Sequence, residues 1–293
     1  MARNQTTPRI ARTLKDLRRH IARYRKSGEQ VALVPTMGAL HEGHLTLVKV
    51  AGKKAQRVVV SIFVNPTQFA PNEDLARYPR DEAGDLEKLS SVGADLVWAP
   101  AAEEMYRPGF ATRIEVKGAA EGLEGAFRPH HFGGVATVCC KLFSQVTPDV
   151  ALFGEKDYQQ LCVIRQMVRD LDLPLTIHGV ATVRERDGLA LSSRNAYLSA
   201  EERTAAPALC TAIRAVAETV AAGGRQAATI KSAIKTLEKA GFGPIDYVAV
   251  ADAETLGPWE LRSGRPGRVL AAAKLGATRL IDNVPIPRPK ARS

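Results

Sequence analysis

The sequence predicts an α/β protein: a Rossmann-like parallel sheet with helices on both faces, plus a smaller C-terminal α+β domain. Up to about residue 182, short and wholly apolar segments alternate with amphipathic stretches, which is typical of buried parallel strands covered by helices. From about residue 183 the chain becomes Ala-rich and helical before further strand-like segments. We therefore expect one domain over 1–182 and a smaller domain over 183–293 that closes over a site in the first.

The elements of the first domain follow in order. Thr13 is placed to cap a helix over 14–26, and Gly28 stands where that helix would end. Strands are expected over 31–34, 58–64, 96–98, 150–153 and 175–180, and further helices over 45–55, 81–91, 135–146 and 158–171. Ligands of such sheets bind beyond the carboxyl ends of the strands, so chemistry is expected directly after several of these strands.

The second domain begins with a helical signal. Ser199-Ala-Glu-Glu202 has the form of a capping box, and the helix expected over 202–222 should break or kink in its first turns at Pro207. A further helix over 230–240 and strands over 247–251 and 269–273 complete the domain. The Pro-rich stretch 285–289 is expected to be mobile.

Charge is concentrated at the two ends of the chain. The formal net charge is +10, with +8 in residues 1–26 and +7 in residues 262–293, which leaves −5 for the middle. This distribution favours solvated basic ends over a body that binds nucleic acid or membrane. A nucleic-acid-binding protein that uses its basic ends stays as an alternative, although the sequence offers no motif that reads DNA or RNA.

The cysteines indicate a reducing compartment. Cys139, Cys140, Cys162 and Cys210 show no C-x-x-C spacing, and the first residues lack the apolar core of a secretory signal. The apolar runs are far shorter than the roughly 20 residues that a membrane helix needs. We expect a soluble cytoplasmic protein.

The most informative segment is Pro35-Thr-Met-Gly-Ala-Leu-His-Glu-Gly-His44, between a strand and a helix. Its glycines permit tight turns, and the helix that begins near His44 offers free N–H groups to a phosphate. His41 and His44 are three residues apart, so both imidazoles can point into one crevice and offset charge that develops at an α-phosphorus. The alternatives are a polar loop with incidental histidines and a zinc site, which would need further ligands.

Two further segments follow predicted strands. Ser61-Ile-Phe-Val-Asn-Pro-Thr-Gln-Phe69 brings two amides that suit a small polar acid, although Asn-Pro is also an ordinary turn. Phe153-Gly-Glu-Lys-Asp-Tyr-Gln-Gln160 brings Lys156 to neutralise phosphate charge and Asp157 to orient a ribose hydroxyl or a cation. Its alternative is an exposed, charged helix start.

Hydroxyl and guanidinium groups come together after residue 182. Leu189-Ala-Leu-Ser-Ser-Arg-Asn195 combines two hydroxyls with a guanidinium, which suits a triphosphate, while a loop with serine caps is the alternative.

In Arg128-Pro-His-His-Phe-Gly-Gly-Val135, the arginine is a candidate for holding substrate, and His130 and His131 are expected to be structural.

These segments together resemble the pantothenate synthetase family, within the H-x-G-H nucleotidyltransferase and class I synthetase superfamily. The matches keep the family's order from about residue 31 to 195, with a weaker echo in Ala277-Thr-Arg-Leu-Ile-Asp-Asn283. The resemblance implies an ATP-dependent ligase that adenylates pantoate and joins it to β-alanine, with release of AMP and pyrophosphate. It also implies Mg²⁺ and a homodimer. A nucleotidyltransferase acting on a phosphate acceptor is the alternative, and it would not need amides placed for a carboxylate.

The resemblance also assigns roles to residues. The implied catalytic residues are His44, His41, Lys156, Ser192, Ser193 and Arg194. The implied ATP contacts are Met37, Gly38, Ala39, Leu40, His41, Glu42, Gly43, His44, Gly154, Glu155, Lys156, Asp157, Val183, Leu191, Ser192, Ser193 and Arg194. The implied contacts to pantoate and β-alanine are Gln68, Gln160, Asn65 and Arg128. Asp85 is the candidate magnesium ligand, in an acidic cluster that Gly84 thins.

Overall fold

The computed structural model describes residues 7–70 and 73–287. In these residues six parallel strands form one sheet, in the order β1-β4-β3-β2-β5-β6. The strands are β1 (Arg9–Ala11), β2 (Val31–Thr36), β3 (Arg57–Ile62), β4 (Leu96–Trp98), β5 (Val150–Gly154) and β6 (Thr176–Val180). The predicted α/β class is therefore confirmed, although β1 was not predicted.

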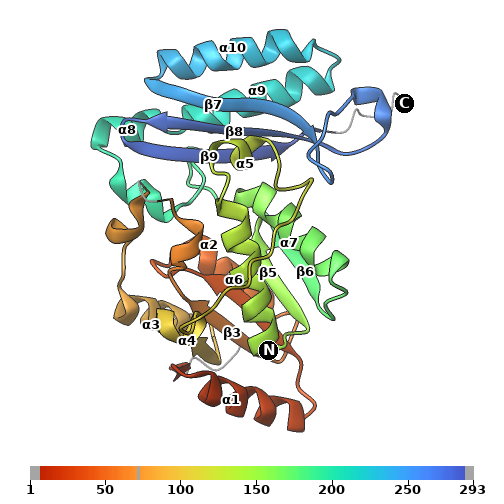
Figure 1. Ribbon diagram of the computed structural model, residues 1–293. Coiled ribbons are helices and arrows are strands. Elements are labelled where there is room, and N and C mark those ends of the chain that lie inside the picture. Colours follow the sequence, from red (N-terminus) through yellow and green to blue (C-terminus); the bar gives the residue numbers. More distant parts are fainter. Residues whose placement is uncertain (1–6, 71–72, 288–293) are drawn as a thin grey trace.

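Helices cover both faces of this sheet because its central strands are apolar on both sides. In β2, Leu33 packs toward α1 (Leu14–Lys26), α6 (His131–Val146) and α7 (Tyr158–Asp170). Its neighbour Val34 packs on the opposite face with α2 (Glu42–Ala51) and α3 (Glu82–Ser91). The short helices α4 (Ala102–Met105) and α5 (Leu123–Phe127) lie in the connection between β4 and α6. Two apolar cores thus hold the sheet in place (Figure 1).

The C-terminal part is a second, smaller domain, which lies above the parallel sheet in Figure 1. Within the described residues an antiparallel sheet has the order β7-β8-β9, with α9 and α10 packed on it. Its elements are α8 (Ala200–Ala205), α9 (Ala208–Ala221), α10 (Gln226–Lys239), β7 (Phe242–Asp252), β8 (Gly267–Leu275) and β9 (Thr278–Pro285). The predicted α+β character is confirmed, and the chain breaks between α8 and α9 at Pro207 as expected.

Two expectations need correction at the C-terminal end. Strand β9 was not predicted, and it reaches Pro285, where a mobile stretch was expected to begin. Ile286 is buried in the core of the smaller domain, so the chain is packed up to that residue. The rest of the predicted mobile stretch, residues 288–289, lies outside the described residues.

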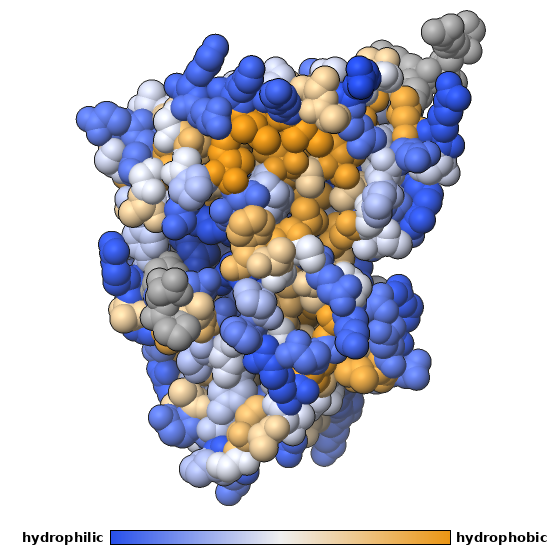
Figure 2. Space-filling view, turned by 45° about the horizontal axis from the view of Figure 1, so that its top comes forward, coloured by the Kyte–Doolittle hydropathy of each residue, from blue (hydrophilic) through white to orange (hydrophobic). Residues whose placement is uncertain are grey.

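Strand β7 forms an edge of the smaller sheet. Its pairing with β8 shifts register between Phe242 and Ile245 and again before Tyr247, and Pro244 lies within the irregular part. Figure 2 shows apolar side chains gathered on the upper part of the molecule, where Figure 1 places α10 and β7. No helix in the described residues is long and apolar enough to cross a bilayer.

Candidate active site

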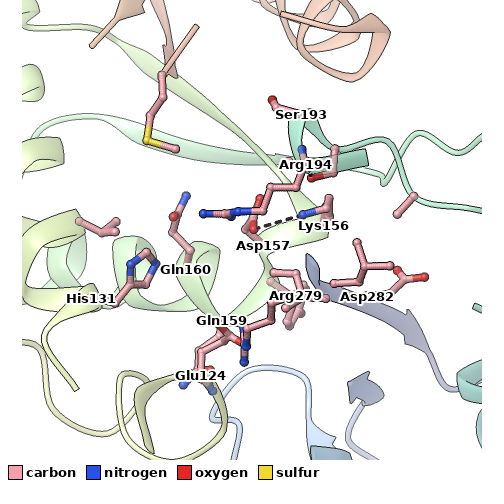
Figure 3. A pocket seen from close by; sticks show the side chains of 18 of the residues that line it. Glu124, His131, Lys156, Asp157, Gln159, Gln160, Ser193, Arg194, Arg279 and Asp282 are labelled. Carbon is pink, nitrogen blue, oxygen red and sulfur yellow. Dashed lines mark hydrogen bonds and ion pairs between the residues drawn. The ribbon is translucent and has the colours of Figure 1, made fainter. Parts of the chain in front are cut away.

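A cleft of about 820 Å³ opens at the carboxyl ends of β2, β3, β5 and β6. Strands β8 and β9 of the smaller sheet contribute its opposite wall. This is the edge of the parallel sheet where the sequence predicted the chemistry, since the segments that begin at Pro35, Ser61 and Phe153 lie at the ends of β2, β3 and β5. Figure 3 shows side chains from the parallel-sheet part and from the smaller domain converging on this space.

Most of the predicted site residues line the cleft. Those that do so are Met37, His41, Gly43, His44, Asn65, Gln68, Arg128, Gly154, Lys156, Asp157, Gln160, Val183, Leu191, Ser192, Ser193 and Arg194. Those outside its lining are Gly38, Ala39, Leu40, Glu42, Asp85 and Glu155. Among the second group, Glu42 pairs with Lys49 on the exposed side of α2. Leu40 is buried in the core beneath that helix.

The two histidines of the first motif are held by the start of α2. His41 is the N-cap residue, and its Nδ1 accepts a hydrogen bond from the backbone N–H of Gly43 at 3.2 Å. The Nδ1 of His44 accepts from the backbone N–H of His41 at 3.4 Å, and the ring centroids lie 4.1 Å apart. Because Nδ1 is an acceptor in both rings, a neutral imidazole carries its proton on Nε2. Both rings are therefore set as Nε2–H donors.

Both imidazoles are held in the neutral form. Burial, followed by the positive charge of Lys156, lowers the pKa of His41 to about 4. Burial, followed by the neighbouring His41, lowers the pKa of His44 to about 3. In the absence of a bound anion both rings are thus uncharged near neutral pH, and they can donate hydrogen bonds without carrying a full positive charge.

Asp85 determines the shape of the loop that carries these histidines. Its carboxylate is 1% exposed and accepts the backbone N–H groups of Ala39 at 2.9 Å and Leu40 at 2.7 Å. Gly38 has φ +81°, and a Cβ there would come within 3.1 Å of the Asp85 carboxylate. The observed contacts of Asp85 are thus those of a residue that holds the loop, and its role as a magnesium ligand stays a prediction.

Cationic side chains from two other segments line the same cleft. Lys156 Nζ lies 3.6 Å from the carboxylate of Asp157, and Figure 3 shows the guanidinium of Arg194 pointing into the same space. Burial opposes ionisation of Asp157, but the charges of Lys156 and Arg194 keep its pKa below the ordinary value. Ser193 Oγ donates to the backbone carbonyl of Ala39 at 3.3 Å, which joins this segment to the histidine loop.

The amide side chains Asn65, Gln68 and Gln160 line the cleft as well. Asn65 is 1% exposed, and its amide binds the carbonyl of Gly134 and the side chain of Gln68. Gln68 in turn donates to the sulfur of Met37, and its backbone carbonyl contacts the ring of His131 at 3.0 Å. Asn65 is therefore committed to holding Gln68, whereas Gln160 points into the open space in Figure 3.

Arg128 does not stand free in the cleft. It donates two hydrogen bonds to Glu73, from Nε at 2.6 Å and from an NH2 group at 2.7 Å. Burial opposes ionisation of Glu73, but the hydrogen bond from Arg128 keeps its pKa below the ordinary value. A substrate carboxylate would have to replace Glu73 to use the same fork of donors.

Some residues of the cleft were not singled out from the sequence. Glu124 in α5 is 6% exposed and accepts two hydrogen bonds from Arg279 in β9, at 2.7 and 2.8 Å. Gln159 is also buried, and its amide binds the backbone of residues 119–124. Glu124 gives no local signal in the sequence, because its partner lies about 150 residues away along the chain. His131, expected to be structural, lines the cleft as well.

The described residues contain no group of three or more His, Cys, Asp or Glu side chains arranged to hold a metal ion. The two histidines instead accept backbone N–H groups of their own loop, as described above. The cleft gathers hydrogen-bond donors and cations around a space large enough for a nucleotide and a small acid.

Comparison with known proteins gives one consistent result. The model of the family described as pantoate-beta-alanine ligase matches residues 9–285. The chain is 57% identical over 284 residues to the pantothenate synthetase of Caulobacter vibrioides, covering 96% of this chain and 99% of that protein. It is likewise 57% identical over 277 residues to the pantothenate synthetase of Rhizorhabdus wittichii, covering 94% of this chain and 98% of that protein.

Solved structures agree with these relatives. The pantothenate synthetase of Thermus thermophilus superposes with a TM-score of 0.88 at 48% identity, covering 95% of this chain and 99% of that chain. The pantoate-beta-alanine ligase of Francisella tularensis, solved with a β,γ-ATP compound and β-alanine, gives a TM-score of 0.79 at 32% identity, covering 95% and 97% of the two chains.

Proposed function

The chain belongs to the pantoate–β-alanine ligase family, and from that premise we propose how its cleft carries out the reaction. The chain is a ligase that forms the amide bond between pantoate and β-alanine with ATP as the energy source. A carboxylate is a poor electrophile, so the reaction proceeds through a pantoyl adenylate. The pantoate carboxylate first attacks the α-phosphorus of ATP and displaces pyrophosphate, and the β-alanine amine then attacks the acyl carbon and displaces AMP.

The first step brings two anions together, and the donors of the cleft offset that charge. We assign His44 and His41 to the α-phosphate, because their Nε2–H groups are the free donors of the loop before α2. Lys156, whose charge acts on both rings, and Arg194 line the same cleft and are assigned to the phosphate oxygens, together with Ser192 and Ser193. Donors fixed before the reaction stabilise developing charge without reorganisation, which makes this the largest expected contribution to the rate.

The amide side chains of the cleft are assigned to the small substrates. Gln68 and Gln160 can hold the hydroxyl and carboxylate groups of pantoate without adding charge that would compete with the phosphates. Asn65 acts through Gln68, to which its amide is bonded. Arg128 is assigned to a substrate carboxylate, with Glu73 as the group that occupies its donors otherwise.

The family resemblance implies further ATP contacts, of which Val183 acts through its backbone. The assignments comprise Met37, Gly38, Ala39, Leu40, Glu42, Gly43, Gly154, Glu155, Asp157, Val183 and Leu191. The side chains of Leu40, Glu42 and Glu155 are occupied elsewhere, so any contact from these residues is to be sought at their backbone atoms.

Magnesium is proposed as the partner of the triphosphate. Mg²⁺ usually keeps several waters and binds one or two carboxylates together with substrate phosphates, so a dedicated cage of protein ligands is not required. Asp157 is the carboxylate beside Lys156 in the cleft and fits this use. When bound, the ion offsets negative charge on the phosphates.

The observation that carries this assignment is the pair of neutral, Nε2–H-donating histidines within reach of the charge of Lys156, in a cleft that Arg194 also lines. The test is product analysis with ATP, Mg²⁺ and pantoate, with and without β-alanine. We expect pantothenate, AMP and pyrophosphate when both substrates are present, and free AMP only when the amine is supplied. Transfer of the nucleotide onto a phosphate acceptor, with no pantothenate formed, would instead identify a nucleotidyltransferase.

Two further assignments concern the surroundings of the enzyme. We propose a cytoplasmic location, which the free thiols of the four cysteines fit. We also propose a homodimer, on the family resemblance alone. Sedimentation of the purified chain tests the second assignment, since a monomer at micromolar concentration would contradict it.

A further inference from the structure

A side chain of the C-terminal sheet reaches into the predicted ATP loop. Asn283 in β9 is 3% exposed, and its Nδ2 donates to the backbone carbonyls of Glu155 at 2.8 Å and of Lys156 at 2.9 Å. Asn283 lies in the short echo of the family pattern at 277–283 and also lines the cleft. Its two hydrogen bonds hold the backbone of the residue whose ammonium faces the phosphates.

The orientation of this amide is fixed by its neighbours. Its Oδ1 accepts a hydrogen bond from the guanidinium of Arg268 in β8, which also donates to the carboxylate of Glu155 at 3.1 Å. The guanidinium lies 3.6 Å from the ring centroid of Tyr158, and Arg268 is 7% exposed. Two carbonyls on one side demand donors and a cation on the other demands an acceptor, so only one orientation of the amide satisfies every partner.

We propose that Asn283 is a positioning residue for adenylate formation. It sets the backbone of Glu155 and Lys156 so that the Lys156 ammonium faces the triphosphate, and it does so only while the C-terminal sheet is seated on the parallel sheet. This inference rests on the proposed role of Lys156. Its consequence is that the smaller domain supplies part of the order of the ATP site as well as a wall of the cleft.

The size of the effect follows from the geometry. Without the two donors the turn at 155–157 loses the contacts that hold it from the side of β9, and a reacting group displaced by about 1 Å can cost about 100-fold in rate. The carbonyls of Glu155 and Lys156 would also lose their partner at a part-buried position, which favours a shift of the turn toward other donors. We expect the loss to fall on the step that uses the triphosphate.

The experiment measures pyrophosphate release in single turnovers with pantoate and no β-alanine, for the wild type and for Asn283→Ala. We expect the adenylation rate to fall roughly 10- to 100-fold, while the KM for β-alanine in full turnover stays unchanged. Asn283→Asp keeps the size of the side chain and its pairing with Arg268 but turns an acceptor toward the two carbonyls. Asn283→Asp should form the adenylate at least as slowly as Asn283→Ala. If the alanine variant does not fold, the same measurement on Asn283→Asp tests the inference.

The matched control is Tyr158→Phe. It removes the hydrogen bond from the tyrosine hydroxyl to the carbonyl of Ala253 at 2.8 Å, another bond between the two domains, but leaves the ring under Arg268 and both bonds of Asn283 in place. We expect an adenylation rate close to that of the wild type. Equal losses in the control and in Asn283→Ala would overturn the inference, because the effect would then reflect domain contact in general.

Lys156→Ala, measured in parallel, separates this inference from the proposed function. A slow Lys156→Ala enzyme together with a normal Asn283→Ala enzyme refutes positioning by Asn283 and leaves the role of Lys156 intact. A Lys156→Ala enzyme with the wild-type rate refutes the proposed role of Lys156 itself, and the inference with it.

Discussion

Replacement of His44 separates the two things that this side chain does. Its Nδ1 accepts the backbone N–H of His41 at 3.4 Å, and its Nε2–H is left to donate to substrate. In His44→Ala both are lost. Loss of this reciprocal bond of the capping box should cost about 1 kcal/mol of stability, which for a chain of this size lowers Tm by only about 2–4 °C. The protein therefore stays folded at assay temperature.

The loss of the donor should be the larger effect. Removing one fixed donor to a developing oxyanion costs about 100- to 1000-fold in kcat, and we expect a loss of this order in pyrophosphate release with ATP and pantoate. The KM for β-alanine should change little, because that substrate is not assigned to His44. Single-turnover release of pyrophosphate is the assay, with circular dichroism to confirm the fold.

His44→Asn is the control that distinguishes the two roles. The Oδ1 of an asparagine takes nearly the place of Nδ1 and can accept the same backbone N–H, but nothing replaces Nε2–H. We expect His44→Asn to recover the melting temperature and to stay as slow as His44→Ala. Adenylation at the wild-type rate in either folded variant would refute the assignment of His44 to the α-phosphate.

The other predictions concern pH, loop geometry and the loop's anchor. The pKa values of His41, His44 and His131 lie at about 4, 3 and 4, below the unfolded value, so the unfolded chain takes up protons first as pH falls. The free energy of unfolding should thus decline from about pH 6.5 toward pH 4, by up to ~1.4 kcal/mol per pH unit for each group. Urea unfolding at several pH values measures this decline. A flat profile would contradict the burial of these rings. Gly43→Ala places a Cβ 2.8 Å from the His41 ring, so we expect slow adenylation in a folded protein, and an unchanged rate would show that the ring position is unimportant. Asp85→Asn leaves one of two backbone N–H groups without an acceptor, so it should lower the free energy of unfolding by about 1–3 kcal/mol. The apparent Kd for Mg²⁺ should not change. A weakened apparent affinity for Mg²⁺ would instead identify Asp85 as a metal ligand.

Elements with strong local patterns were predictable from the sequence. The helix over residues 14–26 has its apolar stripe, its cap at Thr13 and its basic last turn, and it forms with those bounds. Strand β1 is only three residues long, and it is stabilised by pairing with β4, which no local pattern reveals. Strand β9 was hidden for a different reason, since its polar residues Asp282 and Asn283 are buried by partners from distant segments.

The same distinction applies to the candidate site. Motifs that follow strands could be placed at one edge of the sheet, because parallel strands bring their carboxyl ends together. What each side chain does within the cleft depends on partners far away in sequence. Asp85 has two backbone N–H groups as partners rather than open space, and Arg128 already has a carboxylate partner in Glu73. Such pairings are tertiary, so spacing along the chain gives no sign of them.

The irregular edge of β7 bears on how this enzyme behaves in a crowded solution. An exposed sheet edge beside apolar side chains can recruit strands from other molecules and seed aggregates. Here Pro244 lacks an N–H group, and the register of β7 shifts on either side of Ile245. Residues 242–247 therefore offer a neighbouring strand no continuous ladder to join. Strand addition at this edge is therefore disfavoured along the first part of β7.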